Sequence, residues 1–192
     1  MITLIMLVVM TLAAIALIRS TDTTNLIAGN VAFQQSATNA AEEGVENAVI
    51  WLGSPANSIN PSPLQNSIAG HAEYSPVSCG PSTTSNWQSW WGAGSITCAG
   101  NTLTPITTTD SQNNSVSYVI ERLCDKPGDP WAAPASGVVP LVCESPSPVT
   151  EVTSQGATAV QLLVAGPVFY RITSHAQGAK NTQSLVQVIV SQ

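Results

Sequence analysis

Charge is the scarcest property of this sequence. Lysine and arginine together number five and aspartate and glutamate eleven, so charged residues make up 8% of the 192 residues, against about 25% in ordinary globular proteins. The net charge is −6, and the five bases are scattered along the chain. Because nucleic-acid binding needs clustered bases that neutralise phosphates, a single copy of the chain is not expected to bind nucleic acid.

The motifs of catalysis and of metal binding are also absent from the sequence. No GxSxG or HExxH occurs, and His71 and His175 have no evident triad partner. We therefore expect neither enzyme activity nor a cofactor. Asp125 and Asp129 come closest to a calcium site, but two acids without the EF-hand pattern predict a solvated loop instead.

Cysteine is sparse as well, with four residues and neither a CxxC nor a CxxCH motif. These spacings exclude thioredoxin-like redox chemistry, covalent haem attachment and the usual zinc motifs. An even number of cysteines in a chain rich in proline and glycine predicts disulfides in an exported domain. Among the possible pairings we favour Cys79–Cys98 and Cys124–Cys143, because each closes a loop of similar size that is rich in turn formers. Each bond would contribute about 3 kcal/mol.

Proline is absent from the first 54 residues, and this stretch holds the strongest pattern in the chain. Residues 1–18 carry only two polar side chains, Thr3 and Thr11, and are just long enough to span a bilayer. After Arg19, apolar residues recur at helical spacing and share one helix face: Leu26, Phe33, Ala37, Ala41, Val45, Ala48 and Leu52. The opposite face carries Gln35, Asn39, Glu42, Glu43, Glu46 and Asn47. A continuous helix of about 52 residues would be roughly 78 Å long and would end before Pro55.

Three interpretations of this helix differ in what it does. A signal anchor would hold a periplasmic domain to the inner membrane through one span and a short stalk. A pilin would sit in the membrane first and then pack its apolar half against copies of itself in a filament core. A cleavable signal peptide is disfavoured, because a basic n-region is missing and the helical pattern continues past any cleavage point.

Several short runs of residues carry a resemblance to a known family. They are residues 4–12 (LIMLVVMTL), 19–21 (RST), 28–30 (AGN), 33–34 (FQ) and 40–44 (AAEEG). In combination they resemble the N-terminal region of PilX-type type IV pilus proteins. Residues 118–121 (YVIE) and 169–173 (FYRIT) fit the same family.

The resemblance implies a prepilin that a dedicated prepilin peptidase cleaves after a glycine and whose new terminus is N-methylated. The protein would lie in the inner membrane of a Gram-negative-type bacterium before assembly, and afterwards in an extracellular filament. Its partners would be copies of itself, other pilins and the inner-membrane assembly machinery. The implied fold is α+β, with a long helix (residues 1–53) packed on a small antiparallel sheet in a head domain (residues 54–192) whose loops are pinned by disulfides.

In this interpretation residues 1–18 form the filament core and residues 19–53 the amphipathic half. The core contacts would come from Met1, Thr3, Leu4, Ile5, Leu7, Val8, Leu12, Ala14, Ile15 and Ile18. The stretch Ala28-Gly29-Asn30 is the weakest part of the helix, because glycine costs about 1 kcal/mol in a helix interior. We expect this stretch to extend or melt on assembly, as the resemblance implies.

One position departs from the wider pilin pattern. Most pilins carry a glutamate at mature position five, where it pairs with a neighbour's terminal amine, whereas this chain has Ile5 and its first acid is Asp22. A buried amine without a partner is costly, so we expect the hydroxyl of Thr3 or a neighbouring carbonyl to accept its hydrogen bond. Met1 is expected to be the mature terminus or close to it, with a start a few residues upstream as the alternative.

The remainder of the chain shows weaker patterns. Residues 54–114 have no sustained period and predict loops and short strands. In this region Trp87, Trp90 and Trp91 are either a sugar-stacking surface or, as we favour, cover for a core or an inter-subunit contact. Strands are predicted at 115–123, 160–164, 168–173 and 185–190, the last two as an antiparallel hairpin around a turn at 175–181. About four strands would then lie on the amphipathic half of the helix.

These patterns together predict a structural subunit of an extracellular type IV pilus-like filament. The alternative is a low-abundance minor pilin that primes assembly or acts as a tip adhesin through the tryptophan-rich region.

Overall fold

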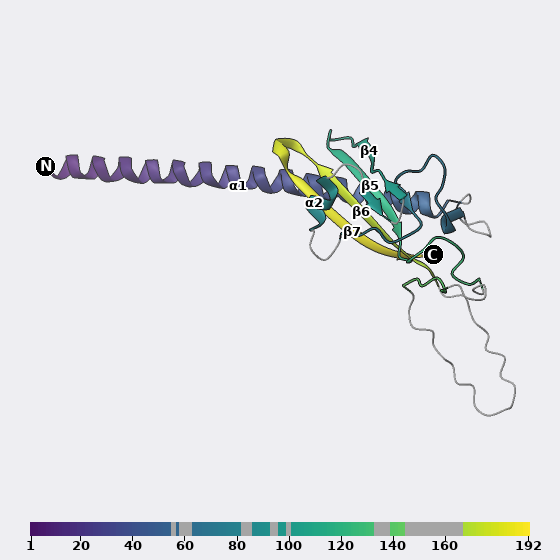
Figure 1. Cartoon of the computed structure of the whole chain (residues 1–192). Helices are drawn as coiled ribbons and strands as arrows, with labels where there is room; N and C mark the ends of the chain where they lie inside the picture. The colour runs from purple at the N-terminus through teal and green to yellow at the C-terminus, as the bar shows by residue number, and fades with distance from the viewer. Residues whose placement is uncertain are drawn as a thin grey trace, which may run out of the picture.

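The chain folds into a long N-terminal helix packed on a mixed β-sheet, an α+β arrangement (Figure 1). The structure is a computed structural model. It describes residues 1–54, 57, 63–81, 86–92, 96–98, 101–132, 139–144 and 167–192, except the side chains of residues 97, 98 and 101.

Helix α1 (Ile2–Leu52) is continuous over its 51 residues, as the sequence predicts, and so is about 77 Å long. It ends where Gly53 and Ser54 turn back, with the Gly53 N–H donating to the carbonyl of Val49 at 2.9 Å. The Asn57 side chain donates to the carbonyl of Trp51 at 2.6 Å and so satisfies one of the carbonyl groups left open at the helix end.

Among the residues that the structure describes, it is the C-terminal part of α1 that packs against the head domain. Its buried residues are Ala37, Ala40, Ala41, Gly44, Ala48 and Leu52. The predicted polar face, from Gln35 to Asn47, is exposed as expected. The sequence placed Leu26 on the apolar face that packs on the head domain, but Leu26 is 66% exposed. Helical periodicity identifies a face, but it cannot tell where along the rod the covering sheet stops.

The main sheet has five strands within the described residues, one more than the sequence suggests. Strand β5 (Ser115–Arg122) lies between β6 (Phe169–Gln177) on one side and β1 (Tyr74–Ser75) and β4 (Ile106–Thr109) on the other. Strand β7 (Gln183–Ser191) follows β6. The sheet is mixed rather than antiparallel, because β1 runs parallel to β5. A two-residue strand such as β1 has too little periodicity to be recognised in a sequence.

The side chains of strand β5 enter the cores on both faces of the sheet, because successive side chains of a strand point to opposite faces. Tyr118 and Ile120 pack with the end of α1 in one cluster, and Val116 packs with Ala40 and Ala41 in another. Val119 points the other way and packs with Val77, Cys79, Ile96 and Leu103. The sheet therefore has the helix on one face and the irregular 77–103 region on the other.

The predicted C-terminal hairpin is confirmed and is longer than the apolar runs indicate. Strands β6 and β7 pair over nine residues each, from Phe169 opposite Ser191 to Gln177 opposite Gln183. The predicted turn at 175–181 starts too early, because His175 still lies in β6 and the chain turns at the 3-10 element η2 (Ala179–Asn181). The predicted strand at 160–164 lies outside the described residues.

The region between helix and first long strand is irregular, as predicted. It contains the 3-10 element η1 (Pro63–Gln65), a short ribbon of β2 (Ile96–Cys98) and β3 (Asn101–Leu103), and a six-residue helix α2 (Trp87–Gly92). The sequence did not predict α2, because one and a half turns give no recognisable period.

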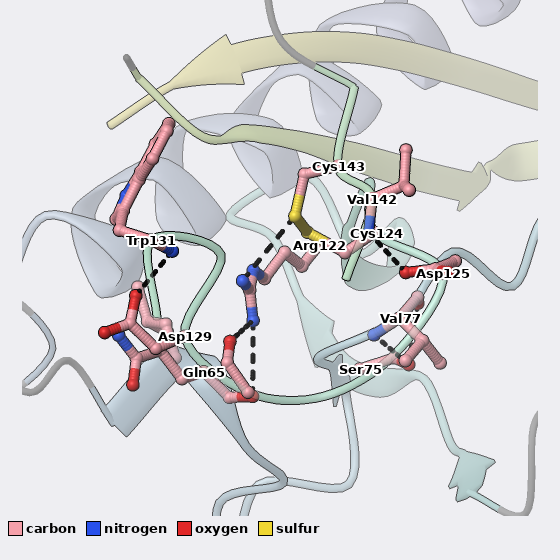
Figure 2. The surroundings of a disulfide bond; sticks show 12 residues. Gln65, Ser75, Val77, Arg122, Cys124, Asp125, Asp129, Trp131, Val142 and Cys143 are labelled. Carbon is pink, nitrogen blue, oxygen red and sulfur yellow. Dashed lines mark hydrogen bonds between the residues drawn. A yellow bond between two sulfur atoms is a disulfide. The ribbon is translucent and has the colours of Figure 1, made fainter. Parts of the chain in front are cut away.

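One of the two predicted disulfides, Cys124–Cys143, is formed and joins residues 19 positions apart. The buried Arg122 lies beneath it and donates to the carbonyls of Gln65 and Gly128 at 3.2 and 2.9 Å (Figure 2). Cys79 is also disulfide-bonded, but the side chain of its predicted partner Cys98 lies outside the described set.

Candidate assembly surface

The N-terminal part of α1 projects from the head domain as a bare apolar rod (Figure 1). An 18-residue window of this helix has a mean hydropathy of 2.5, and none of it is buried in the chain's own fold. Length and composition alone allow such a helix to be a membrane anchor or a signal sequence. Water is a poor solvent for this much apolar surface. This surface therefore needs an apolar partner that the described part of the chain does not supply.

All of the residues predicted to form the filament core lie in this exposed rod. They are Met1, Thr3, Leu4, Ile5, Leu7, Val8, Leu12, Ala14, Ile15 and Ile18. Within residues 1–18 the hydroxyl of Thr11 donates to the carbonyl of Val8 at 2.9 Å, so one of the two polar side chains of this segment is satisfied by the helix itself. The hydroxyls of Thr21, Thr23 and Thr24 donate to carbonyls of the preceding turn in the same way.

The stretch Ala28-Gly29-Asn30 is helical in the single chain and lies outside the head domain. A Cβ at Gly29 would meet no atom within 4 Å. The glycine is therefore not required by packing in the single chain, and its effect there is to weaken the helix. Melting on assembly stays a prediction.

Two hairpin turns hold α1 where it enters the head domain; we call this contact the collar. In the first turn, the Asn114 side chain donates to the hydroxyl of Ser36 at 3.2 Å, and that hydroxyl donates to the side-chain carbonyl of Gln112. In the second, the ammonium of Lys180 lies 5.0 Å from the centroid of the Phe33 ring. The collar therefore marks the boundary between the packed half of the helix and the projecting rod.

A partly buried aspartate, Asp110, shapes the first of these turns. Burial alone would raise the pKa of Asp110, but hydrogen bonds from the side chain and backbone of Asn114 and from the backbone of Gln112 outweigh it and hold that pKa below its usual value. Asn113 adopts a left-handed conformation with φ of 63° to complete the turn. Ionised Asp110 thus orders the loop that contacts Ser36.

The three tryptophans lie together beside the core cluster that contains Val77 and Leu103, and Trp87 contacts the ring of Trp90. Trp90 and Trp91 pack against the Val77–Leu103 cluster and are partly buried. The indole N–H of Trp90 donates to the carbonyl of Cys79 at 3.0 Å, and the Trp91 ring lies 5.6 Å from the His175 ring. This arrangement is the core cover that we favoured, and sugar binding by Trp87, Trp90 or Trp91 stays a prediction without a contact to support it.

A buried ion pair, Glu121–Arg171, was not recognised in the sequence. The two residues are directly opposite each other on β5 and β6, and the Arg171 guanidinium donates to Glu121 Oε2. The same oxygen accepts the backbone N–H of Cys79 at 3.0 Å, and the guanidinium lies 4.9 Å from the Trp87 ring centroid. The pair thus ties the sheet to the tryptophan region.

Charge scarcity was the signal that could have revealed this pair. Both residues fall in the segments 118–121 and 169–173 that carry the family resemblance, and each is the only ion in its segment. Their contact depends on strand register, however, which the sequence does not specify.

Removing Arg171 should destabilise the fold in a pH-dependent way. Burial raises the pKa of the Glu121 carboxyl, while Arg171 and the Cys79 N–H oppose that shift. In Arg171→Met the carboxyl of Glu121 loses its charged partner. The pKa of Glu121 in the folded state therefore rises further above its pKa in the unfolded state. The variant should therefore lose about 3 kcal/mol of unfolding free energy at neutral pH and recover much of it as the pH falls through the folded-state pKa of Glu121.

Urea unfolding of the full chain in detergent at several pH values measures this loss. Lys126→Met is the matched control, because its exposed ion pair with Asp125, at 3.9 Å, contributes little. A loss in Arg171→Met that is the same at all pH values would contradict the assigned role of Glu121.

The calcium hypothesis for Asp125 and Asp129 finds no geometric support. Asp125 Oδ1 accepts the backbone N–H of Val142 at 2.8 Å (Figure 2), and Asp129 Oδ1 accepts that of Trp131 at 2.9 Å. Both carboxylates therefore order their own loop. Among the described residues, no group of three or more histidine, cysteine or acidic residues is arranged to hold a metal ion.

Comparison with known proteins gives no match to a protein-family model, a curated protein or a solved structure. The geometry of this chain and the resemblance of its short motifs are therefore what bear on its function.

Proposed function

We propose that this chain is a structural subunit of a type IV pilus-like filament and assembles through the bare rod of α1. The observation that carries the proposal is the division of one continuous helix into a half packed on its own sheet and a half, apolar over residues 1–18, that the described residues do not cover. Burial of such a half against copies of itself contributes about 25 cal/mol per Å² of apolar surface.

The proposed fold type is that of a pilin, with the head domain carried on the C-terminal half of the helix. Before assembly residues 1–18 of the rod lie in the inner membrane, where their length suits the apolar thickness of a bilayer. Prepilin peptidase and the inner-membrane assembly machinery act on it there. Copies of the chain then form the extracellular helical filament.

A plain membrane anchor is the competing function, and the collar distinguishes the two. An anchor needs only a span and a tether, whereas this helix is held rigidly to its head by Ser36, Phe33 and their partners. A rigid connection is required where the head positions must follow the packing of the helices. The collar therefore favours the filament.

Electron cryo-microscopy of sheared surface fibres, with mass spectrometry of their dominant band, tests the proposal. A helical fibre built mainly of this chain, with residues 1–18 at its axis, is the expected result. Fibres made of another protein with this chain at trace level would instead indicate a minor, assembly-priming or tip subunit. Detection of the chain only in the inner membrane would overturn the filament proposal.

A further inference from the structure

Four of the five basic side chains are engaged within their own chain. Arg122 binds two backbone carbonyls, and Arg171 pairs with Glu121. Lys126 pairs with Asp125, and Lys180 lies over Phe33. Arg19 is the fifth base and lies exposed on the projecting rod, where the described residues offer its side chain no ion pair.

The same helix carries an acidic stripe, defined here as Glu42, Glu43 and Glu46. All three side chains are exposed on the face of α1 that is turned away from the sheet, and the described part of the chain gives them no ion pair. With Asn39 and Asn47 they line a shallow hollow on the helix surface. Like charges four positions apart on a helix repel each other, so a base from outside the chain would stabilise this stripe.

An apolar patch precedes the acidic stripe on the same side of the helix. Ile27 and Val31 are 64% and 49% exposed. Val31 and Glu42 are eleven positions apart, which is about three helical turns, so these two residues lie on nearly the same side of the helix. The side of the helix that carries Val31 therefore carries Glu42 further toward the C-terminus.

A single axial displacement between two parallel copies matches both parts of this face. Arg19 precedes Glu42 by 23 positions and Glu46 by 27, which corresponds to about 35–40 Å along a helix. The same displacement lays the apolar residues 1–18 of the upper copy beside Ile27 and Val31 of the lower one. The pairing of Arg19 with the acidic stripe and the packing of the apolar segments therefore require the same axial displacement between the two copies.

We infer that Arg19 of one copy pairs with the acidic stripe of a second copy of this chain, staggered by that distance. The inference rests on the proposed filament and names the contact between its helices. Asp22 is about one turn from Arg19 on the same side of the rod. The pair gives register to a helix bundle whose apolar contacts alone would allow sliding.

Cross-linking tests the register directly. Fibres of the double variant Arg19→Cys with Glu46→Cys, treated with a short bis-maleimide, should give a ladder of covalent oligomers on a denaturing gel. The matched control is Arg19→Cys with Gln35→Cys, because Gln35 lies on the same outward face about 16 Å nearer the N-terminus and should give no ladder. A ladder from the control but not from the Glu46 variant would overturn the inference.

Charge exchange tests the energetics. Arg19→Glu should lower the fibre yield about tenfold or more, corresponding to roughly 1.4 kcal/mol per contact. Combining it with Glu42→Lys and Glu46→Lys should restore most of that yield. Normal fibres from Arg19→Glu alone would overturn this inference and leave the filament proposal standing. Weakened membrane binding with normal fibres would assign Arg19 to lipid phosphates instead and would also overturn it. A wild-type chain that forms no fibres would overturn the proposed function itself.

Discussion

Leu12→Lys is expected to remove the chain from surface fibres almost completely, lowering its fibre content by about a hundredfold or more, which corresponds to roughly 3 kcal/mol. Leu12 lies in the middle of the apolar rod and is 61% exposed in the single chain. In a bundle of such helices the lysine ammonium would be buried without a carboxylate nearby, because residues 1–18 contain no acid. At the centre of a bilayer the exchange of leucine for lysine also costs about 3 kcal/mol.

The head domain should be unaffected by this change. Leu12 lies more than six turns before Ser36, the hydroxyl that the collar binds, so the unfolding midpoint in detergent should equal that of the wild type. Ser111→Lys is the control, because this exposed turn residue adds the same charge to the head domain and should leave fibre yield unchanged. Immunogold counting of fibres checks both variants. Fibres of normal number with lysine at position 12 would contradict an apolar core built from this rod.

The second large effect is expected at Gly44, where α1 comes closest to the sheet. A Cβ at this position would overlap the hydroxyl of Ser174 on β6 and lie 2.7 Å from Cγ1 of Val116 on β5. Since both neighbours belong to a packed core, the helix would have to move away from the sheet. Gly44→Ala should therefore cost about 2 kcal/mol of unfolding free energy.

Gly29→Ala is the matched control for this prediction and should have the opposite sign. The substitution is the same and both glycines lie in α1, but a Cβ at Gly29 meets no atom within 4 Å. Alanine should stabilise the helix there by up to about 1 kcal/mol. Circular dichroism and urea unfolding of the full chain in detergent separate the two effects.

A third variant tests whether contact with Ser174 causes the loss at Gly44. Adding Ser174→Ala to Gly44→Ala removes the overlapping hydroxyl and should restore part of the unfolding free energy, which is the signature of two coupled positions. Equal losses in the single and double variants would place the cost elsewhere. If Gly29→Ala also reduces fibre yield while stabilising the single chain, the predicted melting of residues 28–30 on assembly gains support.

The periodicity of apolar residues was sufficient to predict the long helix and the long strands. The helix over residues 2–52, the strand near 115–123 and the C-terminal hairpin follow from spacing alone, because many residues repeat the same signal. The Cys124–Cys143 pairing also followed from loop size and turn composition. Short elements such as β1 and α2 offer too few residues for such a pattern, and they were missed.

The close packing of Gly44 against the sheet could not be predicted from the sequence. Gly44 belongs to a run that carried the family resemblance, yet in sequence it differs from Gly29 only by its neighbours. Their opposite roles arise because Ser174 and Val116, which are far away in the chain, pack against one position and not the other. Three-dimensional proximity decides the effect of each glycine.

By itself the sequence determined that the chain begins with one long helix, that the first 18 residues are nearly all apolar, and that Arg19 and three glutamates lie on this one helix. These are properties of neighbours along the chain. Only the tertiary structure decided where the sheet stops covering the helix, that Glu121 meets Arg171, and that the tryptophans cover a core. The Glu121–Arg171 contact joins residues 50 positions apart, and strand register, which local spacing does not encode, brings them together.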